Sequence, residues 1–481
     1  MRQFIGRKNE LQALEEIYGK PGFQMTVIYG RRRIGKSTLI HQFAGQHRCI
    51  YFTAIRAGIS RNLELLGRRV LEVLNPSAAA LGFPDMDTLL TFIGDTCREE
   101  RTILVIDELP FLAEADPGFL SILQSYIDGL WAQSQIYLIL CGSSVSFMEN
   151  EVLSAKSPIF GRRTSQIRLE AFHYPEAAEF VPDYTPEEKA IVYGVTGGVA
   201  HYLSLFDPEL SLDENMITLF FKKTGYLYEE AGNLLTQEFR NTATYSDIIA
   251  AVASGSSRLN EISLKVHMDP AAVLHALANL TVTGIVRKER AITEEKNKKK
   301  VQYVLNDQMF RFWYQFIPDA TGAIEMGKGE VYYQKVVRAR IPEYMGKVFE
   351  DMCRHYTLCA GLNGELNCFV TEVGRWWGTN PAKKEQTDID VVGIDRGNSR
   401  VVLGECKYRN DVLDKKTYEG LTDRIGLISG KYLTVQYLLF SKSGFSEWLH
   451  ENTDPEFVKL ISLEDMYEVE CTGTPLNLSE K

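Results

Sequence analysis

The sequence predicts an α/β protein with more than one domain. A chain of 481 residues with 45% hydrophobic content is longer than a single core supports, so roughly two to four domains are expected. Three apolar runs, residues 25–29, 103–106 and 136–140, have the continuous hydrophobicity of buried parallel strands. Glycine, acidic or hydroxyl residues follow each run, at what would be the carboxyl edge of one sheet.

Bulk charge and hydropathy narrow the possible functions. The formal net charge of -10 gives no basic field over the whole molecule, so any nucleic-acid contact must come from a local patch. The N-terminus lacks an apolar signal region, and no run reaches the roughly 18 apolar residues that a membrane span requires. The sequence therefore predicts a soluble, cytoplasmic protein without a membrane partner.

A phosphate-binding motif, G-x-x-x-x-G-K-[ST], follows the first apolar run and opens a helical pattern. Its glycines let backbone N–H groups surround phosphates, Lys36 would reach the terminal phosphates, and Ser37 can ligate Mg²⁺. The motif predicts ATP and Mg²⁺ as cofactors. The predicted ATP-binding residues are Gly30, Arg31, Arg32, Arg33, Ile34, Gly35, Lys36, Ser37 and Thr38.

Two acids end the second apolar run. Asp107 can hold the Mg²⁺ shell, and Glu108 is the candidate base that polarises water for attack on the γ-phosphate. A solvated acid at a strand end is the alternative for Glu108, less favoured beside Asp107 and Lys36. Ser143 and Ser144 follow the third run, where they either sense the γ-phosphate or simply cap a helix.

The middle of the chain has the element order of a winged helix. Three short helical patterns between residues 242 and 307 are separated at 254–257 and 268–270, and a charged hairpin follows them. Asp269 and Pro270 should cap and open the third helix, residues 271–280, the candidate recognition helix. That helix is poor in side chains that read bases.

The predicted wing, residues 287–300, carries a local excess of basic side chains. Phosphate contact and a merely solvated loop both remain open for it. Its basic residues are Arg287, Lys288, Arg290, Lys296, Lys298, Lys299 and Lys300, and its acidic residues are Glu289, Glu294 and Glu295.

The C-terminal region begins again with a helix around residues 342–358, and Glu350 lies beside its apolar stripe. Three strand-like runs follow, and a turn-rich segment joins the last two into a predicted hairpin. The stripe comprises Met345, Val348, Phe349, Met352 and Tyr356, and the runs are 368–373, 388–394 and 401–406.

Pairing in that hairpin would bring two carboxylates and a lysine together. Asp390 should lie roughly opposite Glu405, while Lys407 shares a strand face with Glu405. Oxygen ligands suit Mg²⁺, and a nearby lysine stabilises a nucleophilic hydroxide or a charged phosphate, as metal-assisted phosphodiester hydrolysis requires. The alternative is a pair of edge-strand acids with Lys407 as their salt-bridge partner.

About the first 200 residues resemble the archaeal-type, STAND-related AAA ATPases. The resemblance implies that Arg162 or Arg163 acts as an arginine finger or sensor, although both could equally be surface charges. Residues 196–200 look like the lid-helix motif of this group, except that Ala200 stands where proline is usual. The matching segments are Phe4-Ile5-Gly6-Arg7 with Glu10-Leu11, Gly30–Ser37, Asp107-Glu108 and Phe160-Gly161-Arg162-Arg163-Thr164.

The C-terminal constellation resembles the PD-(D/E)XK nuclease superfamily, in particular the accessory domain that accompanies this ATPase type. The resemblance implies a restriction-endonuclease-like α/β fold, with Asp390, Glu405, Lys407 and Glu350 as catalytic residues and a metal on Asp390 and Glu405. Asp388-Ile389-Asp390-Val391-Val392 and Glu405-Cys406-Lys407 carry the match, with Trp376-Trp377 and Glu350 in support.

The expected architecture is a P-loop NTPase core with a helical lid, a winged helix and a nuclease-like domain. The expected limits are 1–235, 236–325 and 326–481. The leading hypothesis is an ATPase whose nucleotide state controls a metal-dependent nuclease-like domain acting on nucleic acid, DNA before RNA. The rival is an ATP-switched DNA- or protein-binding regulator with a catalytically silent C-terminal domain. A third possibility is an NTP-driven signalling or defence scaffold that forms a nucleotide-dependent homo-oligomer through the ATPase, with Arg162 or Arg163 acting across subunits.

Overall fold

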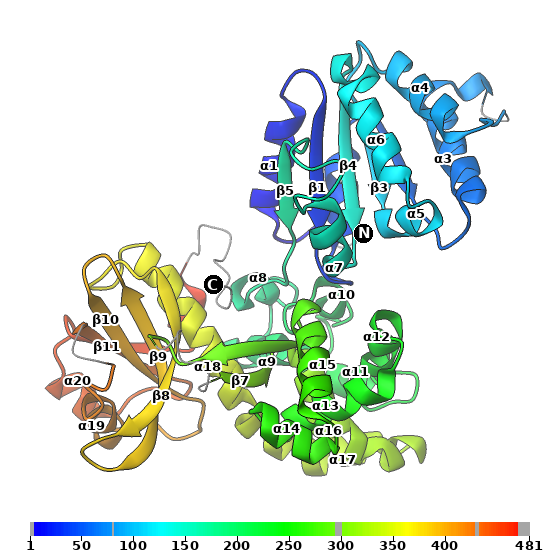
Figure 1. Cartoon of the computed structure of the whole chain (residues 1–481). Helices are drawn as coiled ribbons and strands as arrows, with labels where there is room; N and C mark the ends of the chain where they lie inside the picture. Colours follow the sequence, from blue (N-terminus) through cyan, green and yellow to red (C-terminus); the bar gives the residue numbers. More distant parts are fainter. Residues whose placement is uncertain (1–3, 79–80, 294–300, 429–431, 470–481) are drawn as a thin grey trace. The chain divides into compact units, whose positions relative to one another are not determined.

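The structure, a computed structural model, describes residues 4–78, 81–293, 301–428 and 432–469 (Figure 1). The chain forms two compact units. Met1–Ala171 with Val199–His201 makes up the N-terminal unit, and Phe172–Gly198 with Tyr202–Lys481 makes up the C-terminal unit. Among the described residues, none of the helices is long and apolar enough to cross a membrane.

The described part of the N-terminal unit contains a five-stranded parallel sheet with the order β2-β3-β4-β1-β5. The three apolar runs predicted as buried parallel strands are β1, β3 and β4, and β3 and β4 are buried at every residue. These three strands end at the same edge of the sheet, which confirms the predicted α/β core. The strands are β1 (Gln24–Tyr29), β2 (Cys49–Thr53), β3 (Thr102–Asp107), β4 (Ile136–Gly142) and β5 (Ser165–Arg168).

Successive side chains of β3 point to opposite faces of the sheet, and helices cover both faces (Figure 1). Ile103 and Val105 pack against α1 and α2, whereas Leu104 and Ile106 pack against α3 to α6. The helices are α1 (Lys8–Tyr18), α2 (Lys36–Ala44), α3 (Ile59–Leu74), α4 (Met86–Thr96), α5 (Leu109–Ala115), α6 (Phe119–Asp128) and α7 (Val145–Phe147), with short turns η1 (Pro76–Ala78), η2 (Leu130–Gln133) and η3 (Met148–Val152).

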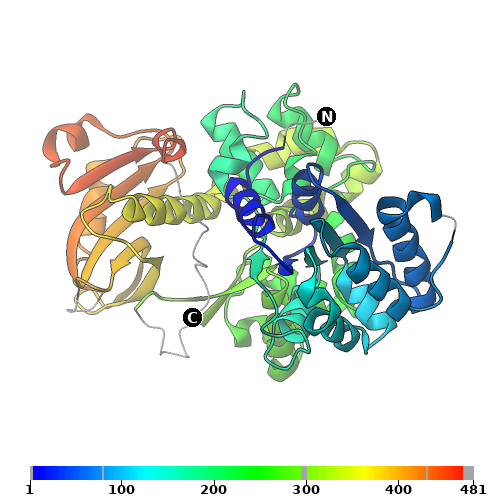
Figure 2. The ribbon, with the colours of Figure 1, turned by 90° about the horizontal axis from the view of Figure 1, so that it is seen from above.

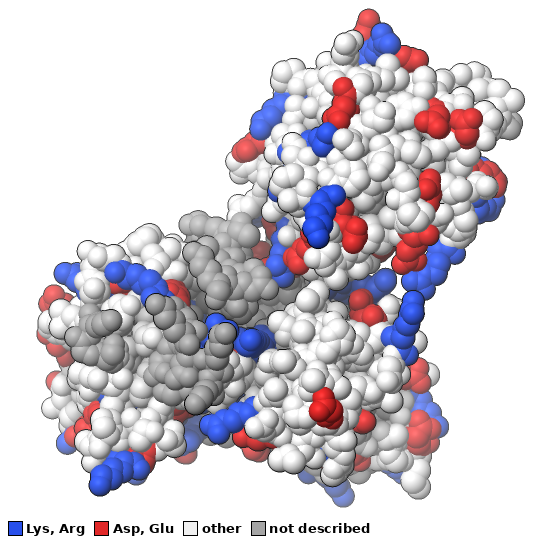
Figure 3. All heavy atoms as spheres, viewed as in Figure 1, with Lys and Arg blue, Asp and Glu red and all other residues white. Residues whose placement is uncertain are grey.

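Surface charge on the N-terminal unit is mixed. On the face drawn in Figure 3, basic and acidic side chains are interspersed over the described surface of this unit. This pattern agrees with the modest negative net charge of the sequence.

The middle of the chain has the predicted order of three helices and a hairpin. Asp269 caps α15, since its carboxylate accepts the N–H group of Ala271 at 2.9 Å, and Pro270 is the first helical residue. The elements are α8 (Tyr174–Ala178), α9 (Pro186–Thr196), α10 (Ala200–Leu203), α11 (Leu212–Phe220), α12 (Glu230–Glu238), α13 (Thr242–Ala253), α14 (Leu259–Val266), α15 (Pro270–Val282), β6 (Val286–Arg290), β7 (Val301–Leu305), α16 (Gln308–Glu325), α17 (Gly329–Tyr332) and η4 (Tyr333–Val337).

The described C-terminal residues contain a second five-stranded sheet, with the order β12-β11-β10-β9-β8. Strands β8 to β10 are antiparallel, so the predicted hairpin is present as β9–β10, and β10 to β12 are parallel. In Figure 2 the long helix α18 runs along this sheet, with its predicted apolar stripe buried. The elements are α18 (Arg338–Leu362), β8 (Glu372–Asn380), β9 (Glu385–Asp395), β10 (Arg400–Lys407), α19 (Lys415–Thr422), β11 (Leu433–Ser441), α20 (Glu447–Asn452), β12 (Val458–Ser462) and η5 (Asp465–Tyr467).

Two predicted boundaries in this region are wrong. The strand expected at 368–373 is β8, which begins only at Glu372. Of the apolar residues before it, Cys368 and Val370 are buried and Phe369 is exposed. Val370 packs closely against α18, since a Cβ at Gly361 would lie 2.3 Å from the Cβ of Val370. The helix expected from Pro342 begins at Arg338, and the proline near its start costs only one backbone hydrogen bond.

The β6–β7 hairpin is docked onto the C-terminal sheet, which the wing prediction did not include. Arg287 pairs with Asp351 of α18 at 2.8 Å, so this wing cation is neutralised within the unit. Beyond β6, the N–H group of Ile292 donates to the carbonyl of Arg375 in β8 at 2.9 Å, and Ala291 and Ile292 are buried in the core of that sheet. Lys288, Glu289 and Arg290 lie in β6. The other predicted wing residues, Lys296, Lys298, Lys299, Lys300, Glu294 and Glu295, lie outside the described residues.

Replacing Asp351 should test this docking. Burial alone would raise the pKa of Asp351, but the charges of Arg287, Arg354 and Arg311 hold that pKa well below its ordinary value. Asp351→Asn removes the nearest acid of Arg287 and Arg354, which keep only longer pairs with Glu289 and Glu350. We therefore expect the free energy of unfolding in urea to fall by about 3–5 kcal/mol at pH 7.

The pH dependence follows from the lowered pKa. The ionised Asp351 stabilises the fold above its unfolded pKa of about 3.9, and that stability is lost as the pH falls towards the folded pKa. The difference in the free energy of unfolding between wild type and Asp351→Asn should therefore become smaller below about pH 4. Arg338→Ala, which removes an exposed pair with Asp213, is the control and should change stability by less than about 1 kcal/mol. If the difference in unfolding free energy between wild type and Asp351→Asn did not change with pH, the role of the Asp351 charge would be contradicted.

Candidate active sites

The phosphate loop connects β1 to α2 through backbone that needs glycine. Gly30 has φ of 151°, and a Cβ there would lie 2.2 Å from the carbonyl oxygen of Leu169. Gly35, at φ of 92°, immediately precedes the first residue of α2. The loop therefore presents its backbone at the N-terminus of a helix, where N–H groups and the helix dipole favour a phosphate.

Lys36 lies inside this loop. Its Nζ donates to the carbonyl oxygens of Gly30 at 2.8 Å and Arg31 at 2.9 Å, and the residue is 6% exposed. Burial lowers the pKa of Lys36, although the nearby acids Glu108 and Asp107 act in the opposite direction. The ammonium group is thus held at the loop, in the position the motif requires for contact with terminal phosphates.

Ser37 and Asp107 lie together, as a Mg²⁺ site beside a phosphate loop requires. The Ser37 hydroxyl donates to Oδ2 of Asp107 at 2.9 Å. Because its proton points at the carboxylate, the hydroxyl keeps its lone pairs for a cation, so Ser37 fits as a direct Mg²⁺ ligand. Tyr51 of β2 donates to the same carboxylate oxygen at 2.7 Å. Sequence reasoning missed Tyr51, since nothing local indicates that β2 lies beside β3.

Glu108 is held next to this site in a strained backbone conformation, with φ of 54° at the start of α5. The Ser143 hydroxyl donates to the two carboxylate oxygens of Glu108 at 2.7 and 2.9 Å. Ser144 instead caps α7, accepting the N–H group of Phe147 at 3.4 Å. Ser144 is therefore the helix cap, and Ser143 is the serine that contacts the candidate base.

Arg162 and Arg163 lie away from the phosphate loop of their own chain. They precede β5, whose first residue, Ser165, pairs with Thr26 in the first half of β1, whereas the loop follows the end of β1. Arg162 forms two hydrogen bonds of 2.7 Å with Asp128, and the Arg163 guanidinium lies 5.5 Å from the ring centre of Phe160. Within one copy, the structure does not bring either arginine to the ATP site.

The segment resembling a lid motif contacts the phosphate loop. The N–H group of His201 donates to the carbonyl of Arg33 at 3.0 Å, and a Cβ on Gly35 would lie 3.4 Å from that of Ala200. Burial, with a further contribution from Arg33, lowers the pKa of His201. Ala200 therefore touches the loop at the position where the resembling motif has proline.

Asp390, Glu405 and Lys407 converge in the C-terminal unit. The β9–β10 register pairs Val391 with Gly404, so the next position places Asp390 beside Glu405. Oδ2 of Asp390 accepts the N–H group of Cys406 at 3.1 Å, and Lys407 donates to Oε1 of Glu405 at 2.5 Å. Burial, followed by the charge of Glu405, raises the pKa of Asp390.

Helix α18 adds Glu350 and Arg354 to this cluster. Burial and then the charge of Asp390 raise the pKa of Glu350, which accepts a hydrogen bond from Lys347 at 2.8 Å. Arg354, buried one helical turn after Glu350, donates to the backbone carbonyl of Asp390 at 3.1 Å. Sequence reasoning missed Arg354, although its spacing from Glu350 placed both residues on one helix face.

Both interpretations of these acids have support. Glu405 is buried on β10, an internal strand of the sheet, so the expectation of edge-strand acids is wrong and its burial favours the catalytic interpretation. Its ion pair with Lys407 is the contact that the structural alternative expects. Within the described ranges, no group of three or more His, Cys, Asp and Glu side chains is arranged to hold a metal ion. Asp390 and Glu405 interact through their charges, and so do Asp390 and Glu350, so these three carboxyl groups share one cluster.

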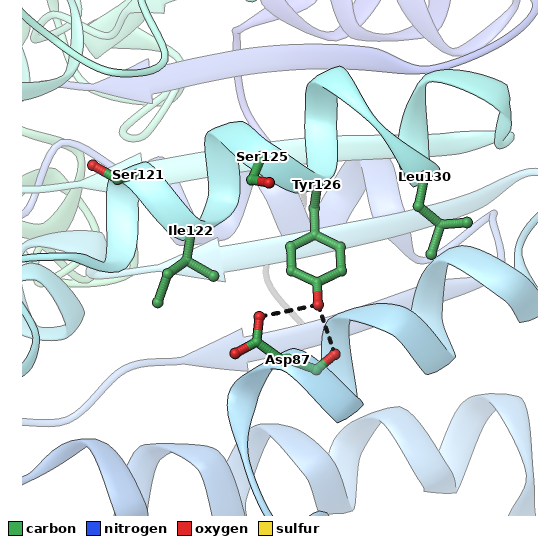
Figure 4. A pocket seen from close by; sticks show the side chains of 6 residues that line it. All are labelled: Asp87, Ser121, Ile122, Ser125, Tyr126 and Leu130. Carbon is green, nitrogen blue, oxygen red and sulfur yellow. Dashed lines mark hydrogen bonds between the residues drawn. The ribbon is translucent and has the colours of Figure 1, made fainter.

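A surface hollow of about 550 Å³ lies between α4 and α6, apart from these sites (Figure 4). Tyr126 points across it and donates to the carbonyl oxygen of Asp87 at 2.9 Å. Phosphate-loop residues do not line it. The hollow is lined by Asp87, Ser121, Ile122, Ser125, Tyr126 and Leu130.

The parallel sheet, glycine loop, Lys36 and Asp107 define the N-terminal unit as a P-loop NTPase. Residues 4–206 match the family described as an ATPase domain predominantly from Archaea, and residues 313–421 match a family of archaeal and bacterial proteins of unknown function. The chain therefore carries an archaeal-type ATPase domain followed by this second domain.

Individual relatives agree with this assignment. The chain is similar to an uncharacterized protein of Methanocaldococcus jannaschii, with 27% identity over 88% of this chain and 92% of that protein. It is also 42% identical over 40 residues to an uncharacterized ATP-binding protein of the same organism, covering 8% of this chain and 68% of that protein. The Walker-type ATPase of Pyrococcus abyssi shares the fold, with a TM-score of 0.51, 19% identity and coverage of 65% of this chain and 96% of that chain.

Proposed function

We propose that ATP binding and hydrolysis in the N-terminal domain control a metal-dependent nuclease site in the C-terminal domain that acts on nucleic acid, DNA before RNA. The convergence of Asp390, Glu405 and Lys407 at the end of the β9–β10 hairpin carries this proposal. Glu350 from α18 adds a third carboxyl group. This chemistry matches that of metal-assisted phosphodiester hydrolysis.

The proposed domain limits are 1–235 for the ATPase with its lid, 236–325 for a winged helix and 326–481 for a PD-(D/E)XK-like nuclease domain. Helices α13 to α15 with the β6–β7 hairpin support the winged helix. The mixed sheet, with α18 along it, supports the nuclease-like fold.

In the ATP site, Lys36 would bind the terminal phosphates, and Ser37 with Asp107 would hold Mg²⁺. Glu108 would accept a proton from the attacking water after leaving the Ser143 hydroxyl. Arg162 or Arg163 would act on the nucleotide of a second copy, since their own phosphate loop follows the opposite end of β1. Assembly of copies around ATP is therefore part of the proposal.

In the nuclease-like site, Asp390 and Glu405 would hold Mg²⁺, which supplies an activated water and neutralises phosphate charge when bound. Lys407, on the same face of β10 as Glu405, would stabilise the hydroxide or the charged phosphate. Arg354 would fix the Asp390 backbone through its hydrogen bond to the carbonyl oxygen.

A second function is favoured by one observation. Both oxygens of Glu405 are already paired with cations, Lys407 and Arg424. A site neutralised in this way suits an ATP-switched regulator that binds DNA or protein, with a catalytically silent C-terminal domain.

Cleavage of plasmid and single-stranded DNA by the full chain separates these functions. Reactions with Mg²⁺ or Mn²⁺, with and without ATP, should show cleavage that Asp390→Ala abolishes and Glu451→Ala, an exposed change on α20, leaves intact. A response to Lys36→Ala would show that ATP controls the cut. Absence of cleavage under every condition would contradict the nuclease and favour the regulator.

A further inference from the structure

Arg424 is a cation of the nuclease-like site that the sequence motifs do not include. It follows α19, outside the sheet, and its Nη1 donates to Oε2 of Glu405 at 2.6 Å. The Arg424 side chain is 23% exposed, whereas the Glu405 side chain is 8% exposed. Arg424 therefore lies between solvent and the buried carboxylate.

The pairing of Glu405 competes with metal binding. Lys407 occupies Oε1 and Arg424 occupies Oε2. A divalent cation on either oxygen would lie within a few ångströms of both positive groups, and like charges at that distance repel strongly in a partly buried site. At least one of the two cations must leave Glu405 for a metal to bind there.

Arg424 is the cation better placed to leave. Lys407 belongs to β10 and pairs in register with Ser441 of β11, so the sheet fixes its backbone two residues from Glu405. Arg424 is outside the sheet and lies farther from Glu405 along the chain than Lys407 does. Once released, the guanidinium group can offer two parallel N–H donors to a phosphate. Carboxylates and phosphates accept such a pair of donors in the same geometry.

Other cations near Arg424 also suit a phosphodiester backbone. Arg375 forms an ion pair with Asp388, and Lys347 donates to Glu350. Burial would raise the pKa of Asp388, but Arg375, Lys347 and Arg424 together lower it, so these side chains share one electrostatic environment. Positive groups thus flank the acids from α18, β8 and the segment after α19.

We propose that Arg424 exchanges partners: it neutralises Glu405 in the ligand-free protein and binds a phosphodiester oxygen of the nucleic acid when a divalent cation occupies Glu405. This inference rests on the proposed nuclease-like site. It makes Arg424 a substrate-binding residue and gives metal and nucleic acid mutually favourable binding, since the metal releases the arginine that the phosphate requires.

Two binding measurements on the full chain without nucleotide test the exchange. Titration with Mn²⁺, followed by calorimetry, should show about tenfold tighter binding for Arg424→Ala, since one charge-assisted hydrogen bond no longer competes. Fluorescence anisotropy with a phosphorothioate DNA duplex and Ca²⁺ should show about tenfold weaker DNA binding for the same variant. A gain in Mn²⁺ affinity together with a loss of DNA affinity distinguishes the exchange from a general loss of structure.

Two further variants make the test specific. Lys383→Ala removes an exposed pair with Asp423, the neighbour of Arg424, and should change neither affinity. Arg424→Lys keeps the charge without the planar fork and should give intermediate values, and it also serves if Arg424→Ala does not fold.

The outcomes separate this inference from the proposed nuclease. Unchanged or weaker Mn²⁺ binding in Arg424→Ala, or no Mn²⁺ binding in any variant, would overturn the exchange. Wild-type cleavage with unchanged affinities in Arg424→Ala would leave the nuclease standing without it. Opposite affinity changes without cleavage by any protein would support the exchange and refute the nuclease.

Discussion

Glu108→Gln should keep ATP bound while slowing hydrolysis by about 10²- to 10⁴-fold. The amide has nearly the shape of the carboxylate and can still contact Ser143, but it cannot accept a proton from water. The phosphate loop, Lys36 and the Ser37–Asp107 contact are left intact. Binding of a fluorescent ATP analogue and steady-state phosphate release measure the two effects separately.

A change on the same helix provides the control for this variant. Glu114 lies in α5, and its carboxylate is 3.8 Å from the Arg56 guanidinium in an exposed pair. Glu114→Gln should preserve both binding and turnover. Turnover near the wild-type rate in Glu108→Gln would exclude Glu108 as the base, and loss of ATP binding would point to a structural role at its strained backbone position.

The N-terminal core was predictable because its signals are local. Each of β1, β3 and β4 is a continuous apolar run that ends in glycine, acid or hydroxyl residues. Parallel strands bring those ends to one edge whatever their order in the sheet. The contribution of Tyr51 depends on β2 lying beside β3, a long-range pairing with no local signal.

The C-terminal site was predictable along the hairpin and, through Glu350, on the helix α18. A short turn fixes which residues of β9 and β10 are opposite, so Asp390 and Glu405 could be paired from the sequence. Arg424 reaches Glu405 from another element, and the docking of Arg287 onto α18 joins residues far apart in the chain. Such contacts depend on tertiary packing, which motif spacing does not encode.

The residues that contact the phosphate loop from α10 lie next to a boundary between the two units in the chain. Ala200 and His201 contact Gly35 and Arg33 of the phosphate loop, and the next residue, Tyr202, belongs to the C-terminal unit. Its hydroxyl donates to the buried carboxylate of Glu230 at 2.6 Å. The chain therefore passes from the N-terminal unit to the C-terminal unit within α10.

Lys36→Ala should weaken ATP binding by about 10- to 100-fold and reduce turnover below detection. The ammonium group is the fixed positive charge for the terminal phosphates, and charge-assisted hydrogen bonds of this kind contribute about 1.5–3 kcal/mol each. The variant also loses the hydrogen bonds to Gly30 and Arg31, so circular dichroism must show that the fold persists.

Two further variants isolate the charge from the packing. Lys36→Met keeps the aliphatic stem in its buried position and should be as inactive as Lys36→Ala, since the missing group is the ammonium. Lys20→Ala removes an exposed lysine of the same unit and should bind and hydrolyse ATP like the wild type. Activity retained in both Lys36 variants would mean that ATP is bound elsewhere, whereas activity retained only in Lys36→Met would assign Lys36 a packing role in the loop.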